Sequence, residues 1–248
     1  MRTITSLMVC TYNRLELTKK MIDSLFTNTD QLFRLIVVDN GSEDGTPEWL
    51  TALDWKSQKN CVGFELQLNP TNRGIAVGRN QCLKIANRFN DPYLSTLDND
   101  IAFTDGWLGK CLDVISANKD YVIGLNMEPN DYPIQTLNGK TFKVKRAGNL
   151  GTACTVFRRE LHQKIGYFIT QYGLYACEDS DFFFRARCVG YKMGYLSEPG
   201  KHLGEGAEDT GHYRAFKDSA HADAAPKFIQ SCGEYATKKR PLYIDFSE

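Results

Sequence analysis

The stretch "FRLIVVDNGSEDGT" (residues 33–46) decides the fold class. A nearly continuous apolar run ends in an acid and passes directly into a segment rich in Asn, Gly, Ser and Asp. Such a run is typical of a parallel strand that is covered on both faces, and the polar segment after it is typical of a turn. The stretch therefore predicts a central sheet with helices on both of its faces.

Strand-like and helix-like segments alternate on both sides of this stretch. Strand patterns occupy residues 4–10, 63–68, 93–98 and 121–127, and apolar residues recur at helical spacing over 17–26, 76–89 and 107–115. This order predicts an α/β fold with a mostly parallel, doubly wound sheet. Later strands are expected at 152–157 and 191–196, and later helices at 160–166 and 179–189.

The chain divides into one domain and an extension. Residues 128–150 contain two Pro and two Gly and are expected to be rich in loops, and the chain after about residue 200 is polar, with one or two helices between 210 and 236. We therefore expect a domain over residues 1–204, made of halves 1–127 and 128–204, followed by a C-terminal extension over 205–248. Its 248 residues are ample for a sizeable core.

Bulk composition excludes several classes of protein. Lys plus Arg equals Asp plus Glu, at 30 each, so no overall field favours nucleic acid or membrane. We find no apolar run near the roughly 18 residues of a transmembrane helix. The start of the chain is expected to be a strand rather than a signal peptide. Eight scattered cysteines without a C-x-x-C pair indicate reduced thiols and a cytoplasmic location; a zinc site or a disulfide framework is the alternative.

Polar segments follow each of the first four predicted strands. These are "TYNR" (11–14), "DNGSEDGT" (39–46), "NPTNRGIAVGRN" (69–80) and "DND" (98–100). Because parallel strands end at the same edge of a sheet, where ligands bind, these segments are expected to meet. Taken singly, each also has a structural interpretation: a helix cap, a turn, or a solvated helix face. None of them fits a dinucleotide-binding or P-loop fingerprint.

Two carboxylates stand close together in "STLDNDIAF" (95–103), with no Lys or Arg beside them in sequence. Residues i and i+2 of a strand point to the same face, so Asp98 and Asp100 are expected to aim at one point. A hard divalent cation would cancel their repulsion. An anionic group of a substrate, such as a phosphate, would complete the shell of that cation. The alternative is a pair of acids in a loop at the end of a strand.

A set of motifs in a fixed order resembles a known family. "VCTYNR", "VVDNGSEDGT", "NRGIAVGRN", "LDND", "YACEDSDFFFR" and "GKHLG" together look like a family 2 glycosyltransferase with the GT-A fold. The resemblance covers about residues 4–204 and leaves the extension uncovered. The small soluble chain and its tail are also somewhat similar to glycosyltransferases encoded by bacteriophages.

The resemblance implies a site for a nucleotide sugar. "DND" looks like the DXD motif that holds Mn²⁺ or Mg²⁺ against the donor diphosphate, with Asp100 as a direct ligand and Asp98 at the ribose or the metal. His202 occupies the position of a further metal ligand, although it could be an ordinary histidine. The implied nucleotide-sugar contacts are Thr11, Tyr12, Arg14, Asp39, Asn72, Arg79, Asn80 and Asp98. Gly78 replaces an alanine that is usual in the family.

The acids of "CEDSDFFFR" carry the catalytic hypothesis. Glu178, Asp179 and Asp181 at a helix start could simply favour the helix dipole and cap free amides. The family's acidic pair supplies a general base, and the resemblance implies that role for Asp179, while Glu178 would orient the acceptor or the donor sugar.

These expectations amount to an inverting, metal-dependent transfer of a sugar, most naturally from a UDP-sugar, to a hydroxyl acceptor. A nucleotidyltransferase of similar fold and an inactive nucleotide-sugar-binding module are the alternatives. The acceptor is expected to be a saccharide or a hydroxymethylated DNA base, contacted through segments that combine basic and aromatic residues. These segments are "KTFKVKR" (140–146), "HYRAFK" (212–217) and "YATKKRPLY" (235–243). Neither the sugar nor the oligomeric state follows from the sequence.

Overall fold

A nine-stranded sheet forms the centre of the protein. The computed structural model describes residues 3–127, 130–145, 148, 150–204 and 212–247. The sheet has the order β3-β2-β1-β4-β9-β6-β10-β8-β7. Its strands are β1 (Thr5–Thr11), β2 (Phe33–Asp39), β3 (Cys61–Leu68), β4 (Tyr93–Leu97), β6 (Tyr121–Asn126), β7 (Ile134–Leu137), β8 (Lys140–Lys145), β9 (Cys154–Arg158) and β10 (Lys192–Pro199).

The first four strands are parallel, as the sequence predicts. β1 pairs with β2 on one side and β4 on the other, and β2 pairs with β3. In register, Thr11 lies beside Asp39, at the carboxyl ends of β1 and β2. The polar segments that follow these strands are thereby brought to one edge of the sheet.

The sheet is mixed beyond β4. β9 runs antiparallel to both β4 and β6, and β10 returns to the parallel direction beside β6. The expected strand at 152–157 is present, but the parallel arrangement does not extend to it. An apolar pattern cannot show this direction, because a strand that is covered on both faces looks the same either way.

Hydrophobic cores cover both faces of the sheet. In β2, Leu35 and Val37 face one core, and Ile36 and Val38 face the other. This alternation explains why the apolar run at 33–39 is continuous. The helices are α1 (Leu15–Asn28), α2 (Thr46–Thr51), α3 (Ile75–Ala86), α4 (Trp107–Ala117), α5 (Arg159–Ile165), α6 (Glu178–Cys188) and α7 (His212–Ala236). α1 and α4 pack in the first core, and α3, α5 and α6 pack in the second.

Two parts of the chain differ from the expectation of loops. Residues 134–145 form the β7–β8 hairpin, which adds to the edge of the sheet at β10. Its strand β7 alternates between exposed and half-buried residues, so it lacks the apolar run by which the other strands were found. A second, two-stranded sheet joins β5 (Ile101–Ala102) to β11 (Lys201–His202). This small sheet brings residues 200–204 beside the turn at 98–100.

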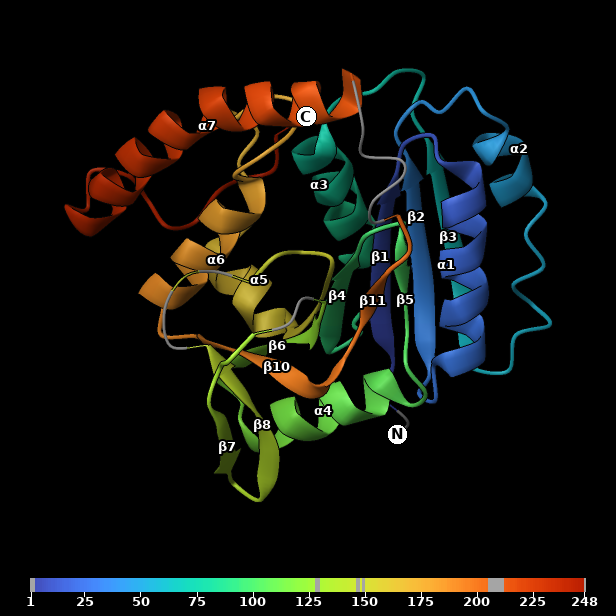
Figure 1. The fold of residues 1–248 in the computed structure, drawn as a ribbon, viewed down its shortest axis with the longest axis horizontal. Helices are drawn as coiled ribbons and strands as arrows, with labels where there is room; N and C mark the ends of the chain where they lie inside the picture. The colour runs from blue at the N-terminus through green and yellow to red at the C-terminus, as the bar shows by residue number, and fades with distance from the viewer. Residues whose placement is uncertain (1–2, 128–129, 146–147, 149, 205–211, 248) are drawn as a thin grey trace.

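The C-terminal extension is packed against the domain. Its single long helix, α7, crosses the end of the molecule that carries α3 and α6 (Figure 1). Farther on, the Ile244 amide donates to the Ile165 carbonyl at 3.0 Å, and the Tyr167 amide donates to the Ile244 carbonyl at 2.9 Å. A Cβ atom on Gly166 would lie 1.9 Å from that Ile244 oxygen, so this approach requires glycine. Within the described ranges, every helix is too short or too polar to cross a membrane.

Candidate active site

A cavity of about 1190 Å³ lies where the predicted polar segments meet. It opens at the carboxyl ends of β1 and β4, between the amino ends of α3 and α6. Ten of the residues predicted to form the site line it: Thr11, Tyr12, Arg14, Asn72, Arg79, Asp98, Asp100, Glu178, Asp179 and His202. Asp39 and Asn80 are not among the lining residues. The convergence expected at the edge of the sheet is therefore present.

The two acids of the DND motif follow the strand instead of lying in it. β4 ends at Leu97, so the expectation that strand alternation aims Asp98 and Asp100 at one point is wrong. The residue between them holds the turn in place. The Asn99 side-chain amide donates to the hydroxyls of Thr11 at 2.9 Å and Thr18 at 3.0 Å. Asn99 was not predicted as a site residue, and its partners lie 88 and 81 positions away in sequence.

Arginines from distant segments supply the positive charge that the local sequence lacks. Arg14 Nη1 lies 3.0 Å from Asp100 Oδ2, and Arg79 Nη2 lies 2.9 Å from Asp98 Oδ1. His202 Nδ1 lies 3.8 Å from Asp100 Oδ1. The acids are thus neutralised in part by the protein itself.

The two carboxyls differ in their acidity. Burial, with the charge of Asp100, raises the pKa of Asp98 even though Arg79 opposes the rise. Burial also acts on Asp100, but His202 and Arg14 outweigh it and lower the pKa of that carboxyl. Asp100 is therefore the more strongly ionised of the two.

The loop that carries Arg14 is in an uncommon conformation. Asn13 and Arg14 have φ angles of 53° and 63°, in the left-handed region that non-glycine residues seldom adopt. The turn after β2 holds them there. The Asn13 amide donates to Ser42 Oγ at 2.6 Å, and Asn13 Oδ1 accepts from the Glu43 amide at 2.9 Å. Such strained positions cluster at functional sites.

Asp39 shapes this turn and does not face the cavity. It is fully buried, and its two oxygens accept from the Gly41 amide, the Ser42 amide and the Ser42 hydroxyl. The arrangement therefore gives no support to direct contact between Asp39 and a bound base. Its influence on a nucleotide would pass through the turn that positions Asn13 and Arg14.

A buried network of amides holds the loop that contains Asn72. Asn40 donates to Asn72 Oδ1 at 2.9 Å and to the Gly74 carbonyl at 3.1 Å, and it accepts from Asn69 at 3.1 Å. Asn69 in turn donates to Gln81 at 2.8 Å. Asn40, Asn69 and Gln81 were read only as members of turn or helix segments. Their pairing across three elements could not be deduced from spacing.

Asn80 has a structural role in this arrangement. Its side chain exchanges two hydrogen bonds of 2.8 Å with the backbone of Phe168, and it is fully buried. Two residues earlier, a Cβ atom on Gly78 would lie 2.2 Å from Cys10 Sγ. In this chain the thiol of Cys10 thus takes the space that an alanine at position 78 would need.

The acidic pair of α6 also lines the cavity and is linked to the DND turn through Arg79. The Arg79 guanidinium, which contacts Asp98 through Nη2, also places its Nη1 2.5 Å from Glu178 Oε1. Glu178 Oε2 is buried and has no hydrogen-bond partner among the described residues. Burial, together with the charge of Asp179, raises the pKa of Glu178 to about 7, although Arg79 opposes this.

Asp179 is the more accessible acid of the pair. It is half-buried and lines the cavity, and its Oδ1 accepts from the Ser180 amide at 2.6 Å. The residues before the pair, Ala176 and Cys177, have φ angles of 83° and 65°. A second strained segment therefore positions the acids, as the first positions Arg14.

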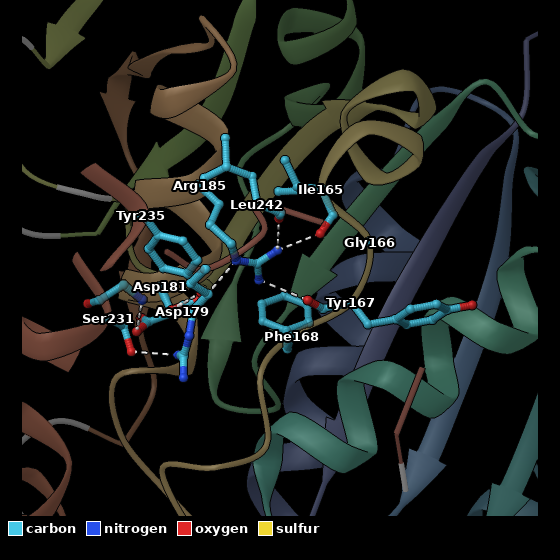
Figure 2. Close-up of polar contacts among 12 residues, drawn as sticks. Ile165, Gly166, Tyr167, Phe168, Asp179, Asp181, Arg185, Ser231, Tyr235 and Leu242 are labelled. Atoms are coloured by element: carbon cyan, nitrogen blue, oxygen red, sulfur yellow. Dashed lines mark hydrogen bonds and ion pairs between the residues drawn. The ribbon is translucent and has the colours of Figure 1, made fainter. Parts of the chain in front are cut away.

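Asp181, the third acid of this motif, is not among the residues that line the cavity, and it lies against Arg185 and Tyr235 (Figure 2). Arg185 Nε lies 2.6 Å from its Oδ1, and both side chains are fully buried. Its Oδ2 accepts from the hydroxyls of Tyr172 and Tyr235, each at 2.9 Å. Asp181 thus attaches α6 to the end of α7, which is a structural role.

The side chains of Asp98, Asp100 and His202 suit a hard cation only together with oxygen atoms from a bound ligand. Among the described residues, no three His, Cys, Asp or Glu side chains already form a group that could hold a metal. Asp98 Oδ2 nevertheless has no hydrogen bond from a described residue, and its side chain is 34% exposed. Two carboxylates and an imidazole are ligands that Mn²⁺ accepts, and oxygens of a bound phosphate could complete the shell. The residues present therefore fit the predicted metal.

The predicted basic segments do not form one surface around the cavity. Among the described residues of these segments, only those at the start of α7 border it: Arg214, Phe216 and Lys217. β8 lies at the opposite end of the molecule from α7 (Figure 1). Arg146, which closes the β8 segment, lies outside the described residues.

Sequence comparison decides the family. The sequence profile described as "Glycosyl transferase family 2" matches residues 6–187. This chain belongs to glycosyl transferase family 2. The match contains the cavity residues from β1 to α6 and ends before α7. No curated protein sequence matches the chain.

Solved structures of glycosyltransferases share the fold. The mannosyltransferase PcManGT from Pyrobaculum calidifontis, in complex with GDP-Man and Mn²⁺, superposes with a TM-score of 0.67 at 19% identity, covering 93% of this chain and 65% of that one. TarS 1-349 from S. aureus, in complex with UDP, has a TM-score of 0.61 at 19% identity, covering 80% and 60%. GalNAc-T7, with UDP, GalNAc and Mn²⁺, has a TM-score of 0.64 at 13% identity, covering 85% and 46%. The chain spans less than two thirds of each of these proteins.

Proposed function

We propose that this family 2 chain is a metal-dependent, inverting glycosyltransferase that takes a sugar from a UDP-sugar. The observation that carries the proposal is the link through Arg79, which joins the DND turn to the acidic pair of α6 in one cavity. A donor diphosphate beside Asp100 and an acceptor beside Asp179 would then lie within the same enclosed space. The structural neighbours contain either GDP-Man or UDP, so the choice of UDP rests on the sequence resemblance.

The donor half of the site would bind the nucleotide. Tyr12 is 44% exposed at the cavity and offers a ring on which a base can stack. Asp98, Asp100 and His202 would hold Mn²⁺ or Mg²⁺, which supplies positive charge to the leaving diphosphate when it is bound. Arg14 would add a further positive charge at the same place, because oriented cations stabilise the charge that develops on a leaving group.

The acceptor half of the site would remove a proton. Asp179 takes the proton from the acceptor hydroxyl as that oxygen attacks the anomeric carbon from the face opposite the diphosphate, so the configuration inverts. Glu178 is less suited to this step than Asp179, because its exposed fraction is only 5% and its Oε1 is paired with Arg79. We assign it to positioning. Holding both reactants in one cavity would itself lower the barrier.

The acceptor is a hydroxyl compound, either a saccharide or a hydroxymethylated DNA base. A role in modifying bacteriophage DNA rests on sequence resemblance alone. We place the reaction in the cytoplasm, since all eight cysteines are free and five of them are buried.

The test is release of nucleoside diphosphate. Purified protein is incubated with a panel of UDP- and GDP-sugars and Mn²⁺, and free UDP or GDP is measured with and without EDTA. Metal-dependent release from a UDP-sugar supports the proposal, and release only from a GDP-sugar corrects the donor. Release of pyrophosphate from nucleoside triphosphates would indicate the nucleotidyltransferase alternative. Binding of nucleotide sugars without release of product, with any acceptor, would indicate an inactive module.

A further inference from the structure

Part of one wall of the cavity comes from α7, which lies outside the residues 6–187 that the family profile matches. Arg214, Phe216 and Lys217 of α7 line the cavity together with Leu174 and Tyr175, which precede α6. We call these five residues the α7 wall. Leu174 is 50% exposed and Phe216 is 41% exposed, so apolar surface is open to a ligand here.

Ring contacts hold the wall together. The rings of Tyr175 and Phe216 have centroids 6.3 Å apart, and Lys217 Nζ lies 5.8 Å from the centroid of Tyr175. Tyr175 also makes an edge contact with the ring of His221, with centroids 5.7 Å apart. The start of α7 is therefore fixed against the segment that leads into Glu178.

A small hydrophobic cluster anchors α7 beneath this wall. Its buried members are Ile169, Tyr172, Ala176, Cys177 and Ala224, with Tyr175 and Phe228 packed against them. Because the cluster contains residues directly before the acidic pair, it sets the position of the α7 wall relative to Asp179. The wall is thereby tied to the segment that leads into Asp179, the residue that the proposed function places beside the acceptor.

The wall also adds positive charge where the acidic pair is negative. In the interior, Arg14 and Arg79 are paired with carboxylates of the protein. Arg214 has an acid partner, Asp218, at 3.2 Å, but both side chains are 64% exposed, and ion pairs of this kind contribute little. An anionic ligand can therefore compete for Arg214, and Lys217 stands one turn farther along the same helix.

We infer that the α7 wall binds the acceptor and selects saccharides that carry a phosphate or carboxylate group. The inference rests on the proposed function. Aromatic and aliphatic surface suits the apolar face of a sugar ring, and Arg and Lys suit its anionic substituent. A DNA acceptor is less well matched, because nucleic-acid sites usually present a basic stripe, whereas here one short segment at the cavity is basic.

The experiment measures binding to immobilised compounds in the presence of UDP and Mn²⁺. The set contains neutral hexosides, the same hexosides as phosphate esters, the corresponding uronates, and duplex DNA with hydroxymethylcytosine. Wild type is compared with Arg214→Ser/Lys217→Ser. The matched control, Lys238→Ser/Lys239→Ser, removes the same charge from residues that do not line the cavity. Stabilisation by UDP and by GDP is measured for all three proteins.

Wild type should prefer the phosphate or uronate form over its neutral counterpart. The α7 double variant should bind the acidic form about tenfold more weakly or worse, since a hydrogen bond to a charged group typically contributes at least that factor. The control should bind as wild type does, and UDP should stabilise all three equally.

Four results would overturn the inference while leaving the proposed function intact: equal binding of neutral and acidic forms, unchanged binding by the α7 variant, tighter binding of the DNA than of any saccharide, or no saccharide bound at all. If neither UDP nor GDP stabilises the wild-type protein, the proposed function would instead be refuted. The relative strength of phosphate and uronate binding separates the two sources of negative charge.

Discussion

The buried ion pair between Asp181 and Arg185 offers a direct test of how the C-terminal extension is attached to α6. We consider the change Arg185→Met, which keeps most of the apolar stem and removes the guanidinium. In the wild type this group binds Asp181 Oδ1 at 2.6 Å and donates to the carbonyls of Ile165 at 2.5 Å and Tyr167 at 2.8 Å (Figure 2). It also donates to the Leu242 carbonyl at 3.3 Å.

The cost follows from burial. Both side chains of the pair are fully buried, so the substitution leaves a carboxylate without its cation in a site that water does not reach. Breaking such a pair typically costs about 3–5 kcal/mol. For a domain of this size each kcal/mol lowers the melting temperature by roughly 2–4 °C, so a fall of about 6–20 °C is expected.

The assay is urea unfolding followed by two spectroscopic probes, with Arg88→Met as the control. Arg88 also pairs with an acid, Glu65 at 2.9 Å, but the two side chains are 58% and 30% exposed. The control should therefore lose about 0–1 kcal/mol. Adding Asp181→Asn to Arg185→Met removes both charges and should recover part of the loss. If Arg185→Met is no less stable than the control, the reasoning about this buried pair is wrong.

Four further predictions concern the cavity. Asp100→Ala, or EDTA on the wild type, should abolish sugar transfer, because either change removes the metal ion that would balance the charge of the donor diphosphate. Activity that survives chelation would rule out the metal. Asp179→Asn should reduce turnover by roughly 10²–10⁴-fold with near-normal UDP affinity, whereas equal losses in both would point to a structural role for Asp179 in α6. The pKa of Glu178 is raised from 4.5 to about 7 by burial, so the folded state holds its proton longer than the unfolded state does. Stability should therefore fall as pH rises from about 4.5 to about 7, and Glu178→Gln should flatten this component in urea titrations at several pH values. Gly78→Ala should destabilise the protein, because the new Cβ would meet Cys10 Sγ, and Cys10→Gly should restore stability; an unchanged urea midpoint for Gly78→Ala would show that the thiol moves aside freely.

The sequence by itself determined the class of fold and the edge at which the site lies. The continuous run at 33–39 required cover on both faces, and the order of the elements required parallel strands whose carboxyl ends meet. These are local properties, because apolar periodicity reports the burial of each segment without knowledge of its neighbours. Apolar periodicity missed β7, because that strand alternates between exposed and half-buried residues and has no apolar run. It also missed the direction of β9, because a fully buried run looks the same whether its neighbours are parallel or antiparallel.

Only the tertiary structure decided how the site residues are paired. Asp98 and Asp100 are neutralised by Arg79 and Arg14, which lie 19 and 86 positions away, and Asn99 is held by Thr11 of β1 and Thr18 of α1. Likewise, spacing could not show that Asp39 turns inward while the start of α7 returns to the cavity. Contacts of this kind depend on how helices and loops pack on the finished sheet, and packing is a property of the whole chain that no single segment carries.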